Sequence, residues 1–220
     1  MSLATIYNSL PSVEFASDAF KDRDATFAKL APLLATYDFQ FGVCLVHRHC
    51  EIEDGEAMVA DGNVSRPVRG GPQYPERWLP DGTPYEFNQE PTKSPPAELV
   101  RDFQTIVGKD ALLGLYYSGD NHEEAPVPVG KTWFERTQGR DNIMELVDSD
   151  NLPEHIETGW IPGAPAPVTM TCSPFSHNPH PALVTMTCSP FSHNPHVSHG
   201  GPPVLVTMTC SPFSHNPHVV

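Results

Sequence analysis

Every charged side chain of this sequence lies at or before Glu157, and the last 63 residues contain none. This segment also holds 12 of the 25 prolines and 7 of the 11 histidines. A stretch with proline at about every fifth position rarely builds a packed core, because proline breaks helices and removes a backbone donor. The sequence therefore predicts one folded body, residues 1–163, followed by a largely irregular Pro/His-rich tail, residues 164–220.

The tail repeats one peptide, Val-Thr-Met-Thr-Cys-Ser-Pro-Phe-Ser-His-Asn-Pro-His, three times without a change, at residues 168–180, 184–196 and 206–218. Each copy supplies one thiol and two imidazoles, which suit Zn²⁺ or Cu(I), whereas the carboxylates that Ca²⁺ and Mg²⁺ prefer are absent. The metal ligands predicted on this pattern are Cys172, His177, His180, Cys188, His193, His196, Cys210, His215 and His218.

Two other interpretations of the repeats remain open. Perfect identity over 13 residues is typical of a recent duplication, in which the extra copies need carry no selected function. The first copy would then be the native end of the body, with residues 168–171 as a last edge strand. Alternatively, apolar and hydroxyl side chains alternate in Val-Thr-Met-Thr as in a half-buried strand, so that identical copies could stack and make the chain self-associate.

The formal net charge of −14 lies entirely on the body. Such a surface repels phosphates, which argues against nucleic acid and anionic membranes as partners. The sequence shows no secretory signal pattern and no uncharged apolar run near the roughly 20 residues of a spanning helix. We therefore expect a cytoplasmic protein with reduced cysteines, in which Cys44 and Cys50 are small buried hydrophobes.

The pattern of the body predicts an α+β domain with a largely antiparallel sheet and two main helices. The first helix is capped by Ser17 and runs toward Tyr37, with Pro32 as a point where it could end early. The second begins at Pro96 and ends at Gly108. Five or six short strands are expected, together with two hairpin turns and one long ordered loop: strands within 39–53, 57–64, 111–117, 131–136 and 142–147, turns at 61–62 and 138–139, and the loop at 66–96.

The strand predicted over residues 39–53 places two histidines on one face. His47 and His49 would lie about 7 Å apart, near enough to share a metal ion. Glu53 or Glu56 could complete a set of two histidines and one carboxylate, which suits non-haem iron. This segment is therefore a candidate metal or acid–base site.

The same segment loosely resembles the first metal motif of the cupins, in which His-x-His is followed by a glutamate and then a glycine, here near Gly62. The resemblance implies a metal bound inside a small barrel. It also implies a later histidine on another strand, and Trp133 stands where that histidine would be expected.

Three functional hypotheses follow from the sequence. The leading one is a protein whose tail binds Zn²⁺ or Cu(I), for handling or buffering the metal. The alternative is a small-molecule enzyme that uses His47 and His49, with Glu53 or Glu56, while the tail is incidental. The third is a self-association or interaction module that acts through the repeats.

Overall fold

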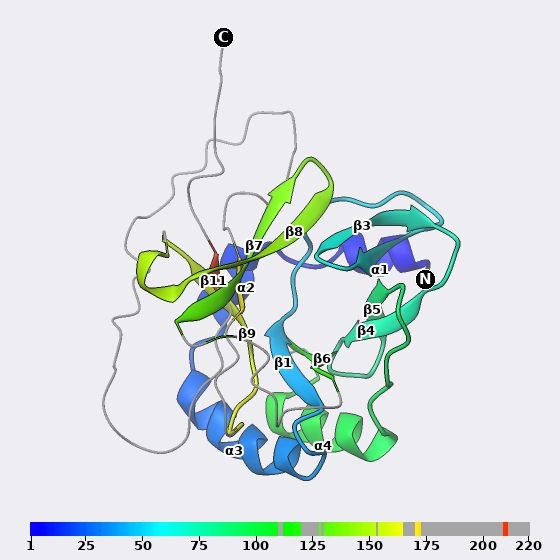
Figure 1. Cartoon of the computed structure of the whole chain (residues 1–220). Coiled ribbons are helices and arrows are strands. Elements are labelled where there is room, and N and C mark those ends of the chain that lie inside the picture. The colour runs from blue at the N-terminus through cyan, green and yellow to red at the C-terminus, as the bar shows by residue number, and fades with distance from the viewer. Residues whose placement is uncertain are drawn as a thin grey trace.

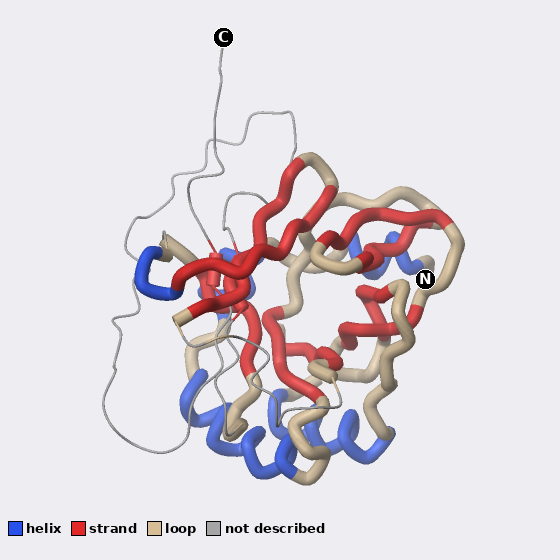
Figure 2. The backbone as a smooth tube through the Cα atoms, in the orientation of Figure 1, coloured by secondary structure: helices blue, strands red, loops and turns tan. Residues whose placement is uncertain are grey.

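The structure, a computed structural model, describes residues 1–109, 112–119, 128, 130–152 and 154–164, and the backbone of 170–172 and 209–210. These residues form one α+β body whose mostly antiparallel sheet curls and closes on itself (Figures 1 and 2). The α+β class and the single body are thereby confirmed. Within the described part of the chain, no helix has the length and apolar character needed to cross a membrane.

The helices of the described residues are α1 (Leu3–Asn8), α2 (Val13–Ala19), α3 (Arg23–Ala35) and α4 (Ala97–Val107), with a short 3₁₀ turn at Ser149–Asn151. The strands are β1 (Phe41–Leu45), β2 (Glu56–Asp61), β3 (Val64–Arg69), β4 (Tyr74–Trp78), β5 (Pro84–Asn88), β6 (Leu113–Tyr117), β7 (Lys131–Gln138), β8 (Asp141–Asp148), β9 (Ile156–Trp160), β10 (Met170–Cys172) and β11 (Thr209–Cys210).

The strands follow one another around a closed barrel in the order β1-β6-β4-β5-β2-β3-β8-β7-β11-β10-β9, and β9 returns to β1. Most neighbours are antiparallel, but β2 pairs parallel with β5. β10 and β11 pair parallel with β7 and with each other. The largely antiparallel sheet predicted from sequence is thus present, with more strands than expected.

The apolar face of the sheet packs against the helices. Phe41, Val43 and Leu45 project from alternate positions of β1 into one core cluster, and Leu115 of β6 joins them. In Figure 1, α3 and α4 lie side by side against this part of the sheet and contribute leucine and phenylalanine side chains to the cluster. Because β1 alternates, its other face, which carries Cys44, is turned toward the barrel interior.

The first helix was predicted with the wrong boundaries, since α2 and α3 share its span. The chain bends at Phe20, whose ring packs against Phe27 and Trp160 at centroid distances of 5.7 and 6.0 Å. Ser12 caps α2, and Pro32 lies inside α3 without ending it. Phe20 therefore packs at the corner between α2 and α3.

The strand predicted over 39–53 is confirmed only for β1, which ends at Leu45. Val46 still donates to the carbonyl of Leu112, next to β6, but from Arg48 onward the chain bonds to the N-terminal segment. The side-chain amide of Asn8 donates to the carbonyl of Ile52 at 2.8 Å and accepts the N–H of the same residue at 2.9 Å. Both predicted site histidines consequently lie on a loop, where alternation does not apply.

The long loop predicted over 66–96 is wrong, because the segment contains most of β3 and all of β4 and β5. The pairing of β4 with β5 shifts register on both sides of Arg77, which marks a β-bulge. Arg77 and Trp78 are adjacent in sequence and both are buried, Trp78 among the apolar residues that pack on α3 and α4. Because of the bulge, this proline-rich strand contributes a charged side chain to the centre of the protein.

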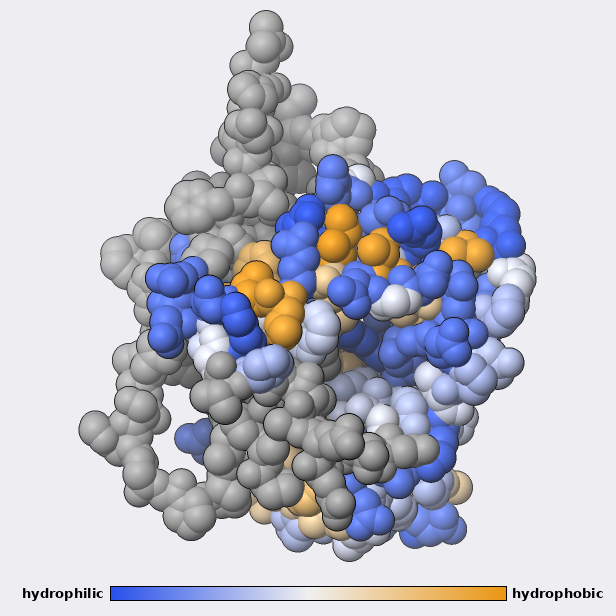
Figure 3. All heavy atoms as spheres, viewed as in Figure 1, coloured by the Kyte–Doolittle hydropathy of each residue, from blue (hydrophilic) through white to orange (hydrophobic). Residues whose placement is uncertain are grey.

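Several local signals predicted their elements correctly. Helix α4 is flanked by Pro96 and by Gly108, whose φ of 94° few other residues adopt. The hairpins β2–β3 and β7–β8 turn at Gly62 and Gly139, with φ values of 57° and 66°. Among the residues that carry a hydropathy colour in Figure 3, hydrophilic ones predominate on this face, in keeping with the acidic composition of the body.

Candidate functional site

Five ionisable side chains are buried together at the centre of the barrel, and we call them the interior cluster: His47, His49, Arg77, Glu86 and Glu135. Each is at most 8 % exposed. Burying so many charged or chargeable groups costs free energy unless they compensate one another. The cluster is therefore the part of the fold that most requires a functional or structural explanation.

The two histidines of the cluster lie on the loop that follows β1. Their ring centroids are 4.8 Å apart, with an angle of 73° between the ring planes. The Nδ1 atom of His47 lies 2.8 Å from the carbonyl oxygen of Leu45. Because a carbonyl can only accept, Nδ1 donates this hydrogen bond and the ring lone pair is on Nε2. The backbone N–H of His49 donates to the hydroxyl of Tyr7 at 3.1 Å, which holds the loop against α1.

Burial, and next the neighbouring His49, lower the pKa of His47 to about 3. At neutral pH its imidazole is therefore uncharged. A neutral imidazole is the form that binds a metal ion or accepts a proton.

Glu86 of β5 joins the histidines to the arginine. Its Oε1 lies 3.3 Å from Nε2 of His49 and its Oε2 lies 3.2 Å from Nε of Arg77. The hydroxyl of Tyr7 donates to the same Oε1 at 3.3 Å. Burial opposes ionisation of Glu86, but Arg77 and then His49 outweigh it and lower its pKa to about 2. Glu86 is accordingly a carboxylate under all ordinary conditions.

Glu135 comes from the middle of β7 and is wholly buried. One of its oxygens, Oε1, accepts a hydrogen bond from Nη2 of Arg77 at 3.2 Å. The other, Oε2, is buried and accepts no hydrogen bond from the residues that the structure describes. Burying a carboxylate oxygen without a hydrogen bond costs free energy. The same oxygen can serve as a ligand atom for a metal ion.

The structure brings Glu135 to the histidine pair. One ligand atom each from His47, His49 and Glu135 lie within 4.8 Å of one another, and all three residues are buried. Sequence reasoning missed Glu135, although a signal existed. Trp133 occupies the place expected for a third ligand, and Glu135 lies two residues further on, on the same face of the strand.

The two carboxylates that the sequence proposed as the third ligand are engaged elsewhere. Glu53 pairs with Arg69 at 2.5 Å, and its side chain is 70 % exposed. Glu56 pairs with Arg140 at 2.5 Å, and Arg140 is the first of the causes that lower the pKa of Glu56. Since the chain between β1 and β2 is not a strand, neither carboxylate belongs to the group formed by the two histidines.

The ligands predicted in the tail are only partly covered by the structure. The backbones of Cys172 and Cys210 lie in β10 and β11 and are in register with one another. The other seven predicted ligands fall outside the described residues.

The charges of the interior cluster do not cancel. With both carboxyl groups ionised, Glu86 and Glu135 carry two negative charges, and Arg77 carries one positive charge. One negative charge is left over in a place removed from water, where an uncompensated charge is unfavourable. A bound cation would balance this charge.

Both cysteines of the body are buried, as predicted, and neither has the properties of a nucleophile. Burial raises the pKa of Cys44 to about 11, even though Arg77 is near enough to act in the opposite direction. The sulfur of Cys44 lies 3.5 Å from the hydroxyl of Tyr85. Cys44 thus lies beside the interior cluster. Burial likewise raises the pKa of Cys50 to about 11.

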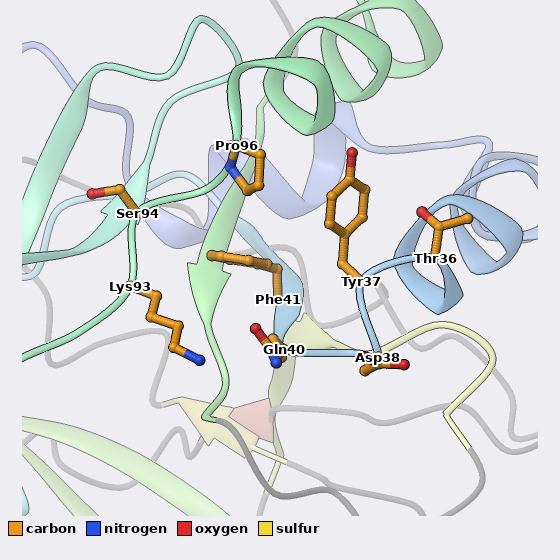
Figure 4. A pocket seen from close by; sticks show the side chains of 8 residues that line it. All are labelled: Thr36, Tyr37, Asp38, Gln40, Phe41, Lys93, Ser94 and Pro96. Atoms are coloured by element: carbon orange, nitrogen blue, oxygen red, sulfur yellow. The ribbon is translucent and has the colours of Figure 1, made fainter.

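A separate, open hollow of about 270 Å³ lies at the end of α3 (Figure 4). Figure 4 shows Tyr37 and Phe41 side by side, with Lys93 and Pro96 across from them. None of the residues that line it belongs to the interior cluster. Its two charged side chains, Asp38 and Lys93, are exposed to solvent, so the buried interior cluster remains the candidate site.

Comparisons with known proteins assign no identity to the chain. No protein-family model matches the sequence. No curated protein and no solved structure matches it either. The site must therefore be interpreted from its own geometry.

Proposed function

We propose that this protein binds a divalent transition-metal ion inside its barrel, through His47, His49 and Glu135. The observation that carries the proposal is that these three buried residues offer ligand atoms within 4.8 Å of one another. Two imidazoles and one carboxylate suit Fe²⁺ and Zn²⁺. Cu(I) prefers sulfur ligands, and the nearby Cys44 is held as a thiol by its raised pKa.

The surroundings of the three residues support this proposal. His47 is fixed by its hydrogen bond to Leu45 with the lone pair on Nε2, as is usual for metal-binding histidines. Glu86 lies against the ring of His49, a carboxylate–histidine arrangement that orients a ligand and raises its basicity. A divalent cation would also neutralise the excess negative charge of the interior cluster.

The number of ligands bears on the role of the metal. Structural zinc sites use four protein ligands, whereas catalytic sites keep a position open for water or substrate. Three ligands therefore favour metal-dependent chemistry on a small molecule over a purely structural site. Arg77, which is held by Glu86 and Glu135, supplies a positive charge beside this position.

The test is a metal titration of the full chain in which the nine predicted tail ligands are replaced, cysteine by serine and histidine by asparagine. Apo protein titrated with Zn²⁺ by calorimetry should bind one ion per chain. In this background His47→Ala and Glu135→Gln should each weaken binding by about 100-fold or more, because a direct ligand matters at least as much as the groups that orient it. His155→Ala is the matched control and should leave binding unchanged.

Circular dichroism of each variant must show that it is folded, and Glu135→Gln, which keeps the side-chain shape, is the more informative substitution. Absence of binding by the tail-substituted chain would contradict the proposal. Binding that survives both site substitutions would do so as well.

The tail remains a second candidate for metal binding. The observation in its favour is that Cys172 and Cys210, from different copies, are in register on neighbouring parallel strands. Two copies could then contribute to one Zn²⁺ or Cu(I) site. In that case wild-type protein should bind additional ions, and replacing the nine ligands should remove them without affecting the interior site.

A further inference from the structure

The side chain of Tyr7, in helix α1, is buried against the loop that carries both histidines. It is 0 % exposed, and its ring belongs to an apolar cluster that includes Val46 and Ile52. A phenolic hydroxyl can both donate and accept a hydrogen bond, and that of Tyr7 does both. It accepts the backbone N–H of His49 at 3.1 Å and donates to Oε1 of Glu86 at 3.3 Å.

Both contacts of this hydroxyl act on the same proposed metal ligand. The first fixes the backbone from which the side chain of His49 projects. The second holds the carboxylate of Glu86, whose Oε1 lies 3.3 Å from Nε2 of the His49 ring. Burial raises the pKa of Tyr7 well above its ordinary value, so the phenol keeps the proton that it donates. One hydroxyl group therefore orients both the main chain and, through Glu86, the ring of His49.

The next residue of α1 fixes the other end of the histidine loop. The side-chain amide of Asn8 holds the N–H and the carbonyl of Ile52, at 2.9 and 2.8 Å. Between these two anchors, the N–H of Arg48 donates to the carbonyl of Pro11 at 3.1 Å, and its guanidinium donates to the carbonyl of Asn8. Because residues 46–55 lie between β1 and β2 and outside both strands, these bonds hold the loop in place of strand pairing.

We propose that helix α1 is a positioning element of the metal site, in which Tyr7 and Asn8 hold the histidine loop in the conformation that binds the ion. This role rests on the proposed function, and it adds two residues that do not contact the metal. A loop that is already ordered loses less conformational freedom when the ion binds, which strengthens binding. Removing a group that orients a metal ligand costs about 10–100-fold in affinity.

A purely structural role for α1 predicts a different result. The ring of Tyr7 fills the apolar cluster and contributes to stability whether or not a metal is bound. Tyr7→Phe separates the two roles, because it keeps the ring and removes the hydroxyl. Tyr85→Phe is the matched control. Tyr85 belongs to the same cluster and is 1 % exposed, but its hydroxyl lies 3.5 Å from the sulfur of Cys44, which is not a proposed ligand.

The test is a calorimetric Zn²⁺ titration of the full chain with the nine tail ligands replaced, which serves as the parent of each variant. Tyr7→Phe should weaken Zn²⁺ binding by about 10–100-fold, whereas Tyr85→Phe should leave the affinity unchanged. Co²⁺ in place of Zn²⁺ gives a visible absorption spectrum that depends on ligand geometry, and this spectrum should change only in Tyr7→Phe. Urea denaturation of the metal-free chains shows that each variant is folded and measures its loss of stability separately.

A second variant keeps the test decisive if Tyr7→Phe does not fold. Asn8→Ala releases Ile52 and should weaken Zn²⁺ binding by roughly 10-fold. Ser9→Ala is its control, because the hydroxyl of Ser9 donates to the carbonyl of Ile6 at the end of α1 itself. A parent chain that binds Zn²⁺ while the folded variants bind it equally well would overturn the positioning role alone. A parent chain that binds no Zn²⁺ would overturn the proposed function and the positioning role together.

Discussion

The interior cluster and strand β10, which pairs with both β7 and β9, meet at β7, yet they are built in opposite ways. The interior cluster draws single residues from the loop after β1, from β4, from β5 and from β7, and no residue has a substitute. The sequence of β10 belongs to a peptide that the chain carries three times. The difference teaches that a single substitution in the cluster removes a group that occurs only once in the chain.

The largest effect is expected from breaking the ion pairs of the cluster. Arg77→Met leaves Glu86 and Glu135 buried without their shared cation, and we expect a loss of about 3–5 kcal/mol in the free energy of unfolding. Urea denaturation of the full chain measures it. Arg66→Met removes an arginine whose pair with Asp141 is 49 % and 40 % exposed, and it should cost at most about 1 kcal/mol. Similar losses in the two variants would contradict the importance assigned to the cluster.

A smaller effect is expected from crowding the strand that neighbours Arg77. A Cβ added at Gly114 would lie 2.4 Å from the backbone oxygen of Trp78, next to the bulge. We expect Gly114→Ala to lower the free energy of unfolding by about 1–3 kcal/mol, because backbone must shift. At Gly62 an added Cβ meets nothing within 4 Å, so Gly62→Ala should cost only about 1 kcal/mol, from its positive φ. Thermal melts of the two variants check the order, and equal costs would argue against the close approach at Gly114.

The smallest effect is expected from breaking the ion pair between Glu56 and Arg140 near the surface, and this effect should depend on pH. Arg140, the leading cause, lowers the pKa of Glu56, so the pair contributes stability above the ordinary glutamate pKa. Glu56→Gln should cost about 1 kcal/mol at pH 7. The difference from wild type should shrink as the pH falls below about 4.3 and through the lower pKa of the folded state. Urea denaturation at about pH 7, 5 and 3.5 measures the difference in the free energy of unfolding. A difference that does not depend on pH would contradict the assignment.

Elements that depend on local signals were predictable from the sequence. Proline and glycine mark the two ends of α4, and Gly62 and Gly139 mark the hairpin turns. The wrong predictions have a common cause, because the structure of each of these segments depends on residues that are distant in the sequence. The strand after Leu45 ends early because Asn8 binds Ile52, and the proline-rich segment forms strands because β2 and β6 provide edges for it.

The candidate site was half predictable for the same reason. His47 and His49 are close in sequence, and their spacing indicated a joint role. Glu135 is 86 residues beyond His49, and Arg77 lies in a segment that its composition described as a loop. Only the closure of the barrel brings β4 and β7 to the histidines, and closure depends on pairings that periodicity cannot identify.

The identity of the atoms around a bound metal tests the central claim most directly, because the interior site and the tail differ in their donors. Zinc-edge X-ray absorption should be measured on full-length wild-type protein that carries one equivalent of Zn²⁺. A metal held by His47, His49 and Glu135 should have only nitrogen and oxygen neighbours, at about 2.0–2.2 Å. Sulfur neighbours at about 2.3 Å would place the metal on the tail cysteines and contradict the account.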